Sequence, residues 1–206
     1  MNGFNLIAPV YDGLSTLVFG NSIRRAQQYY LEEARAARKI LVIGGGTGLI
    51  LGALLEINPS CEVWYIEASS RMLDRAKKRL ARRPESRVHF IHGTEHDIPA
   101  EVEFDVVIAN FFFDVFQPPA LEKTISLIGR VVSGNGKILV SEFVANGVWW
   151  HRIMLTIMYL FFRLVGALDA RKLPDWQNQL RREGFGESKS RLFCRAFIKS
   201  AVYQRT

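Results

Sequence analysis

Cysteines, metal-ligand clusters and long apolar runs are all scarce in this sequence of 206 residues. Its two cysteines, Cys61 and Cys194, are isolated, so we expect reduced structural thiols and a cytoplasmic location. The four histidines lack partners at zinc-ligand spacing, so no metal site is predicted. Residues 1–19 have no basic n-region and are interrupted by Asp12, which does not fit a signal peptide.

Two common phosphate-binding patterns are also missing from the glycine-rich part of the chain. No G-x-x-x-x-G-K-[ST] sequence occurs, which argues against a nucleoside triphosphate P-loop. Residues 44–48 give G-x-G-x-G, and Leu49 stands where a dinucleotide fingerprint requires its third glycine. The glycines alone are weak evidence for a ligand, because a tight strand-to-helix turn without one has the same composition.

The elements on either side of these glycines nevertheless predict a ligand-binding sheet. Lys39–Ile43 is a short apolar run rich in β-branched residues, as in a buried parallel strand. Apolar residues then recur at helical spacing up to Ile57, and Pro59 ends the pattern. A strand, a glycine turn and a helix form the ligand-binding half of a doubly wound α/β sheet.

A second apolar strand, Glu62–Glu67, ends in a carboxylate about 20 residues after the glycines. A carboxylate in this place can accept hydrogen bonds from both hydroxyls of a ribose. The alternative is that Glu67 is a solvated strand end or the acid of a helix N-terminus. Ser69 or Ser70 then caps a helix with Met72 on its inner face.

Six motifs, in this order, resemble the class I S-adenosylmethionine-dependent methyltransferases, and most of all the group that includes the ubiquinone/menaquinone C-methyltransferases. They are residues 8–12, 44–48, 67–76, 93–99, 104–107 and 133–140. The resemblance implies an α/β fold of one domain, with a doubly wound, mostly parallel, Rossmann-like sheet of seven strands and an antiparallel C-terminal edge. It also implies that S-adenosylmethionine is the cofactor and S-adenosylhomocysteine the product.

The resemblance further implies a set of cofactor contacts. They are Tyr11, Gly44, Gly45, Gly46, Gly48, Glu67, Ala68, Met72, Gly93, Thr94, Glu95 and Asn110. Tyr11 is expected to lie across the methyl donor or, alternatively, to be a core tyrosine. In two places the sequence departs from the family, because Val42 and Thr94 stand where many relatives carry an acid. Glu95 or Asp97 is a candidate replacement for the second of these acids.

The loop after the fourth expected strand lies where the transferred methyl group should point. Residues 110–114 read Asn-Phe-Phe-Phe-Asp, which is not the Pro-Pro-aromatic motif of many nucleic-acid amino-methyltransferases. Three phenylalanines favour an apolar or aromatic acceptor, although they fit a protein core equally well. Asp114 is the nearest candidate for a catalytic base, and the alternative is an inert surface acid.

By these patterns the chain divides into four parts of a single domain. Residues 1–38 are expected to form a helical cap, 39–143 the cofactor-binding core, 144–184 a helical substrate or interface insertion, and 185–206 the antiparallel strands. The pair Gly134 and Gly136 is expected to make the turn into a fifth strand that begins at Lys137.

The segment 149–168 is apolar nearly all round a helix, and it begins with two tryptophans. Arg163 interrupts it, and it is too short for a confident membrane span. Three interpretations remain open: peripheral membrane or acceptor contact, a homodimer interface, and an ordinary core helix.

The function that fits these features is methyl transfer to a small apolar acceptor, such as a lipid or a quinone. One alternative is a non-catalytic scaffold with this fold. The other is a basic RNA methyltransferase, which a net charge of +7 permits. The phenylalanine-rich loop and the missing Pro-Pro motif argue against a nucleic-acid partner.

Overall fold

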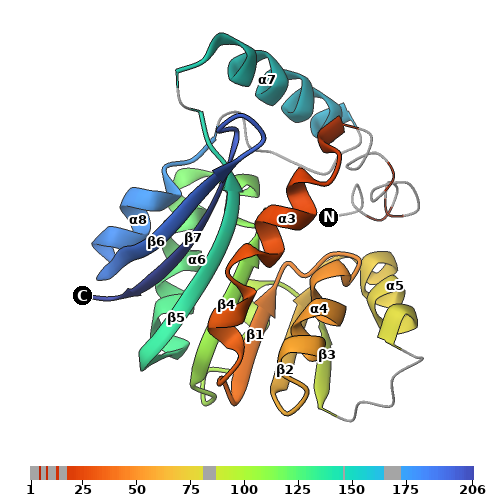
Figure 1. Cartoon of the computed structure of the whole chain (residues 1–206), viewed down its shortest axis with the longest axis vertical. Helices are drawn as coiled ribbons and strands as arrows, with labels where there is room; N and C mark the ends of the chain where they lie inside the picture. Colours follow the sequence, from red (N-terminus) through yellow and green to blue (C-terminus); the bar gives the residue numbers. More distant parts are fainter. Residues whose placement is uncertain are drawn as a thin grey trace.

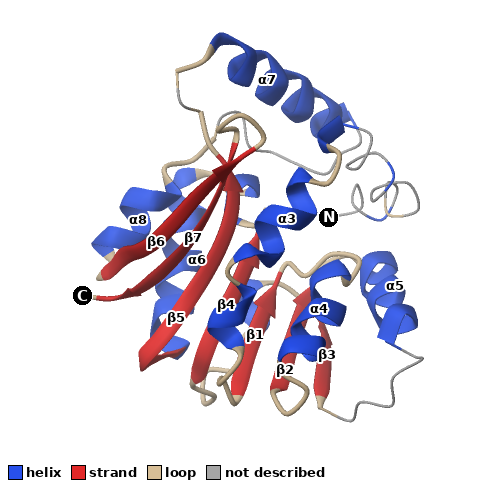
Figure 2. Ribbon diagram, viewed as in Figure 1, coloured by secondary structure: helices blue, strands red, loops and turns tan. Residues whose placement is uncertain are grey.

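The computed structural model describes residues 5, 8, 13, 18–80, 87–145, 147–164 and 173–206. Its centre is a seven-stranded sheet with the order β3-β2-β1-β4-β5-β7-β6, shown in Figure 2. The strands are β1 (Lys39–Ile43), β2 (Glu62–Glu67), β3 (Val88–His92), β4 (Phe104–Asn110), β5 (Val132–Phe143), β6 (Phe185–Phe193) and β7 (Ile198–Arg205). Strands β1 to β5 are parallel, and β7 runs antiparallel to both β5 and β6, which confirms the predicted fold class.

Helices cover both faces of this sheet (Figure 1). They are α3 (Ser22–Tyr29), α4 (Leu49–Ile57), α5 (Ser70–Leu80), α6 (Pro118–Val131), α7 (Trp149–Leu164) and α8 (Trp176–Arg182), with the short 3-10 turns η1 (Leu31–Ala34), η2 (Glu95–Asp97) and η3 (Phe113–Val115). Alternate residues of β1 face opposite sides: Leu41 and Ile43 pack in the layer of α6 and α8, whereas Ile40 and Val42 pack in the layer of α4, α5 and η1. A strand buried on both faces must be apolar throughout, which explains the continuous apolar run of β1.

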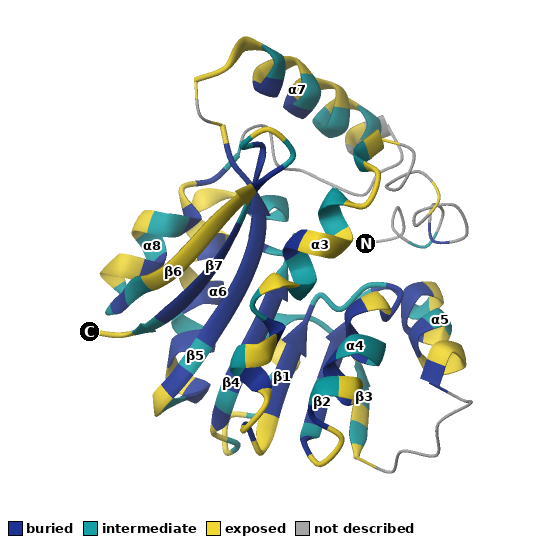
Figure 3. Cartoon of the chain, viewed as in Figure 1, coloured by how far each residue is buried: buried dark blue, intermediate teal, exposed yellow. Residues whose placement is uncertain are grey.

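A third apolar cluster joins α7 and α3 to the hairpin formed by β6 and β7. Its buried members are Ala26, Phe143, Leu155, Phe193, Phe197 and Ile198. In Figure 3 the side of α7 turned away from the rest of the protein is largely exposed. Across the described ranges, every helix falls short of the length and apolar content that a bilayer crossing requires.

One local prediction was wrong. Gly134 and Gly136 lie inside β5, which begins at Val132 and not at Lys137. The pairing of β4 with β5 shifts register in this region, and a Cβ on Gly136 would lie 2.9 Å from the carbonyl oxygen of Phe104. Glycine therefore permits close approach of two backbones here. Within the expected helical cap of residues 1–38, α3 ends at Tyr29 and the chain continues into η1.

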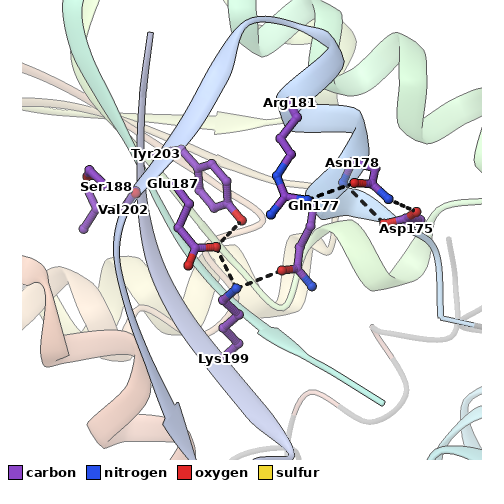
Figure 4. Close-up of polar contacts among 9 residues, drawn as sticks. All are labelled: Asp175, Gln177, Asn178, Arg181, Glu187, Ser188, Lys199, Val202 and Tyr203. Carbon is purple, nitrogen blue, oxygen red and sulfur yellow. Dashed lines mark hydrogen bonds and ion pairs between the residues drawn. The ribbon is translucent and has the colours of Figure 1, made fainter. Parts of the chain in front are cut away.

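Polar contacts fasten α8 to the antiparallel edge of the sheet (Figure 4). Glu187 Oε2 accepts hydrogen bonds from Lys199 Nζ at 2.6 Å and from Tyr203 Oη at 3.1 Å. Lys199 Nζ also donates to Gln177 Oε1 of α8, at 2.8 Å. Asp175 caps the same helix, because its Oδ1 accepts from the Asn178 N–H at 3.3 Å. The C-terminal strands and α8 thus form one connected unit.

Asn58 connects the end of α4 to the chain that leads into β1. Its side chain is 2% exposed, and Nδ2 donates to the carbonyl oxygens of Ala34 at 2.8 Å and Ala37 at 2.7 Å. Buried carbonyl groups that lose their donor become costly, since water cannot replace it.

We therefore expect Asn58→Ala to lower the free energy of unfolding by about 1–3 kcal/mol, the usual cost of leaving buried polar groups unpaired. Urea denaturation at equilibrium measures this change. Asn135→Ala is the matched control, because Asn135 is exposed on β5 and its loss should cost less than about 0.5 kcal/mol. Equal destabilisation by both variants would contradict the role of the two hydrogen bonds.

Candidate functional site

A cavity of about 320 Å³ opens at the carboxyl ends of the parallel strands. It lies where β1 and β4 are neighbours and their following loops lead to helices on opposite faces, which is where doubly wound sheets bind ligands. Its lining comes from α3 (Ile23, Gln27), the turn after β1 (Gly44, Gly45, Gly46, Thr47), the end of β2 (Glu67, Ala68), α5 (Met72), the loop after β3 (Gly93, Thr94, Glu95, His96) and the region after β4 (Asn110, Phe111, Phe112, Val115, Phe116), together with apolar residues of β1, β2, β4 and α4.

The glycine turn forms the floor of this cavity, and two of its glycines are required for different reasons. A Cβ on Gly45 would lie 2.2 Å from the ring of Tyr65, so no larger residue fits there. Gly46 has φ +64°, and a Cβ there would meet no atom within 4 Å. The open space beside Gly46 is therefore available to a ligand rather than filled by protein.

Gly48 differs from the other predicted glycines, because it does not line the cavity. It is the residue before α4, with φ +83°, and a Cβ there would lie 2.8 Å from Cα of Ala76 in α5. Its place in the structure is a close helix-to-helix contact beneath the site.

Glu67 connects the loops that follow β1 and β2. Its Oε2 accepts from the Gly46 N–H at 2.8 Å, and its Oε1 accepts from the Ser69 N–H at 2.7 Å. Burial raises the pKa of this carboxyl, although the two backbone N–H groups act in the opposite direction. The side chain lines the cavity while it holds the glycine turn in place.

The loop after β3 places Gly93, Thr94 and Glu95 on the cavity as predicted, but the side chain of Thr94 is used locally. Its Oγ1 accepts from the His96 N–H at 3.4 Å, so Thr94 caps η2. Asp97 Oδ2 accepts from the Thr94 N–H at 2.8 Å, and Asp97 is not among the lining residues. Glu95 is thus the acid that this loop presents to the cavity.

Of the three phenylalanines after β4, two line the cavity and one belongs to the protein core. Phe111 and Phe112 line the cavity, whereas Phe113 is fully buried in the core beside α6. Phe111 has φ +52°, an uncommon backbone conformation for a bulky residue. Asn110 also lines the cavity, and its Nδ2 is buried with no hydrogen-bond partner among the described residues.

Asp114 does not face the cavity, in contrast to its predicted place near the transferred group. The residue is partly buried and its Oδ1 atom is shielded from solvent, and burial raises the pKa of its carboxyl to about 7. The charge of Asp114 interacts with that of Glu142 in β5, a buried acid for which no role was predicted from the sequence. The only sequence signal for Glu142 is an acid inside an otherwise apolar strand.

The N-terminal segment reaches the neighbourhood of the cavity through Asn5 and α3. Tyr11 lies outside the described residues. Asn5 is described, and its Oδ1 accepts from Ser69 Oγ at 2.7 Å, so this segment reaches the start of α5. Two lining residues of α3, Ile23 and Gln27, were missed. The predicted helical cap was the available signal, but a helical pattern does not show which residues face a ligand.

The charged side chains that line the cavity limit the kinds of ligand that it can bind. Glu67 and Glu95 are acidic, and no lysine or arginine appears among the lining residues of the described chain. A site for several phosphate groups normally provides cationic side chains. This cavity is better suited to a ligand that carries positive charge and has hydroxyl groups.

Comparison with known proteins agrees with this geometry. Residues 40–136 match a family model described as a methyltransferase domain. Malonyl-(acyl-carrier protein) O-methyltransferase of Halalkalibacterium halodurans is 30% identical over 148 residues, which cover 68% of this chain and 53% of that protein. The protein of the same name from Priestia megaterium is 28% identical over 146 residues, covering 71% of this chain and 51% of that protein. The chain spans about half the length of these curated relatives.

A solved structure extends the likeness to nearly the whole chain. The 1,6-didemethyltoxoflavin-N1-methyltransferase of Burkholderia thailandensis, with its substrate and S-adenosylhomocysteine bound, has a TM-score of 0.73 at 17% identity. The match covers 99% of this chain and 87% of that one. At this identity the likeness concerns the fold, so the chain has the class I methyltransferase fold.

The open space at Gly46 can be tested directly. We expect Gly46→Ala to abolish measurable binding of S-adenosylhomocysteine in calorimetry, because the added methyl group would occupy the cavity. Gly184→Ala is the matched control, since Gly184 has φ +81° and also has no atom within 4 Å of a built Cβ. Both variants should lose about 1–2 kcal/mol of stability from the left-handed backbone. Normal affinity in Gly46→Ala would place the ligand elsewhere.

Proposed function

We propose that this chain, which carries a class I methyltransferase domain at residues 40–136, transfers a methyl group from S-adenosylmethionine to a small apolar acceptor. The observation that carries the proposal is the cavity, which combines an open glycine turn, two acids and an apolar wall without a cation among its described lining residues. The two alternatives are a non-catalytic scaffold and an RNA methyltransferase.

The lining provides groups that fit each part of this cofactor. Glu67 would accept from the ribose hydroxyls, and the loop from Gly93 to Glu95 would hold the adenine. The turn from Gly44 to Gly46 would hold the methionine part, and the unpartnered Nδ2 of Asn110 is a free donor beside it. Together with Glu95, the buried carboxyl of Glu67 would offset the positive charge of a sulfonium.

Methyl transfer from this cofactor mainly requires that the protein align the methyl donor with the acceptor. When bound, S-adenosylmethionine supplies a methyl group that is already electrophilic. The task of the residues around it is to exclude water and to hold the acceptor in line, and orientation of this kind accounts for a large share of many enzymic rate enhancements. Asp114 does not line the cavity, so it has no direct role in proton transfer from the acceptor.

The acceptor is inferred from the apolar wall. Phe111, Phe112 and Phe116 line one part of the cavity, with Val115 beside them and Ile23 of α3 contributing as well. Aromatic rings provide large apolar contact area, and they favour a flat or hydrocarbon-rich acceptor such as a quinone or a lipid. A long nucleic acid would instead require a basic groove beside the cavity.

Transfer of labelled methyl groups tests this function. We expect the protein, incubated with methyl-labelled S-adenosylmethionine, to label the organic-solvent extract of cells and to leave total RNA unlabelled. Gly46→Ala should abolish the labelling and Gly184→Ala should retain it. Labelled RNA would favour the RNA methyltransferase, and binding of S-adenosylhomocysteine without labelling of either fraction would favour the scaffold.

We also propose that α7 docks on an anionic membrane surface. Its outward stripe exposes Trp149 (73%), Ile153 (51%), Ile157 (57%) and Leu160 (56%) to solvent. Arg152 and Arg163 are exposed beside these residues, and the helix contains no acid. A helix with an apolar stripe, a tryptophan and flanking arginines is typical of an element that lies in the membrane interface.

The charges favour a membrane over a second copy of the chain. A symmetric pair of α7 helices would bring the arginines of both copies into one interface without an acid from either helix, and like charges repel. Lipid phosphates supply the opposite charge. The inner side of α7 packs in the same apolar cluster as Phe111, which lines the cavity. Docking there would hold the apolar wall close to a membrane-dissolved acceptor.

Vesicle binding tests the docking surface. We expect the protein to cosediment with vesicles of anionic phospholipid and to detach as salt rises, because the attraction between surface charges is screened. Arg152→Gln with Arg163→Gln should weaken binding by about 2 kcal/mol, roughly 1 kcal/mol for each charge. The matched control replaces two exposed arginines of α8, Arg181 and Arg182, in the same way. A salt-independent dimer that ignores vesicles would support the alternative interface.

A further inference from the structure

Glu142, near the end of β5, is a fully buried acid that holds the loop of the neighbouring strand. Its Oε1 accepts from the N–H groups of Phe112 and Phe113, each at 2.7 Å. A carboxyl group is costly to bury, and it persists in a protein interior only where partners compensate. These two hydrogen bonds span 30 and 29 positions of the sequence and connect β5 with the segment after β4.

The loop held by Glu142 forms a wall of the cavity. Phe112 lies against the glycine turn, since a Cβ on Gly44 would be 2.5 Å from its Cδ2 atom. The preceding residue, Phe111, has φ +52° and donates its N–H to the carbonyl oxygen of Ser141 at 2.7 Å. A backbone conformation of this kind persists only where the surroundings enforce it. Ser141 and Glu142 of β5 provide that enforcement.

A second acid completes the arrangement. Glu142 Oε2 and Asp114 Oδ1 are buried, and neither has a hydrogen-bond partner among the described residues. Burial and the nearby charge of Asp114 raise the pKa of Glu142, and burial raises the pKa of Asp114 to about 7. Among the described residues, Tyr159 of α7 also faces this pair: its Oη donates to the carbonyl oxygen of Asp114 at 3.5 Å, and its pKa is raised by burial and by both acids. The charges of the two acids interact in the protein interior, so both cannot ionise cheaply, and a proton retained by the pair relieves the repulsion.

We propose that Glu142 is a positioning residue for the cavity, and that the pair of Glu142 and Asp114 retains a proton, which keeps the loop 111–114 in place against the glycine turn. Its consequence for cofactor affinity rests on the proposed function. Its consequence for the loop does not, because the hydrogen bonds to Phe112 and Phe113 are independent of any ligand.

The sign of the pH dependence follows from the raised pKa of an acid. Asp114 in the folded protein keeps its proton up to about pH 7, whereas in the unfolded chain it loses it near its ordinary value of 3.8. Between these values the folded state binds more protons, so its stability falls as pH rises. Above about pH 7 Asp114 loses its proton, while Glu142, whose pKa is raised by burial and by the charge of Asp114, retains the last proton of the pair. Loss of that last proton at higher pH should loosen the loop through repulsion between the two acids.

The test compares Glu142→Gln with Glu142→Ala. A glutamine keeps an acceptor for the two N–H groups and offers an N–H to Asp114 without adding charge. We expect wild-type affinity for S-adenosylhomocysteine to fall as the pH rises above about 7, and Glu142→Gln to flatten this profile. Glu142→Ala should weaken binding about tenfold or more, the equivalent of losing one or two hydrogen bonds to a carboxyl. Glu187→Gln, an acid of β6 away from the cavity, is the matched control and should leave the profile unchanged.

Hydrogen exchange and thermal unfolding provide readouts that need no cofactor. We expect the amides of Phe112 and Phe113 to lose protection in Glu142→Ala and to keep it in Glu142→Gln, and Asp114→Asn to flatten the pH dependence of the unfolding temperature. If the wild type binds no S-adenosylhomocysteine, the proposed function fails while these readouts still decide the role of Glu142. An unchanged pH profile in Glu142→Gln, or unchanged protection in a folded Glu142→Ala, would overturn the inference.

Discussion

The cavity depends first on the buried carboxyl of Glu67. One of its oxygens accepts from Gly46 and the other from Ser69, so a single side chain joins the glycine turn to the start of α5. Burial raises its pKa and makes its charge costly, and the two backbone hydrogen bonds offset that cost. The same carboxyl lines the cavity. The group best placed to recognise a ligand is therefore also the group that shapes the floor beneath it.

The opposite wall of the cavity is also held in place by a buried acid. Glu142 is buried at the end of β5, and its hydrogen bonds hold Phe112 and Phe113 in the loop after β4. In both places an acid at the carboxyl end of a parallel strand holds the backbone of a loop that follows a neighbouring strand. Loops are the least constrained part of an α/β fold, so such acids give the site a defined shape. Neither hydrogen-bond set has a basic partner, which leaves the interior of the site acidic.

The apolar strands of the sheet were predictable from the sequence for a physical reason. Apolar runs such as Lys39–Ile43 are buried on both faces, and this produces a pattern that is visible without a structure. The acid at the end of β2 was equally predictable, because its distance from the glycines follows from one strand–helix–strand unit. Gly48 was less predictable, since a glycine required for contact with Ala76 has the same sequence signature as a glycine that approaches a ligand.

The apolar strands, the glycine turn, Glu67 and the phenylalanine-rich loop could thus be recognised from the sequence itself, because periodicity and turn chemistry are local properties. Only the tertiary structure decided which of those side chains face the cavity. Asp114 is turned into the protein and Phe113 into the core, while Phe111 and Phe112 line the site. The partners that decide these orientations, Glu142 on β5 and Tyr159 on α7, are 28 and 45 positions beyond Asp114 in the sequence. Contacts over such separations arise from the packing of strands and helices, and no local pattern encodes them.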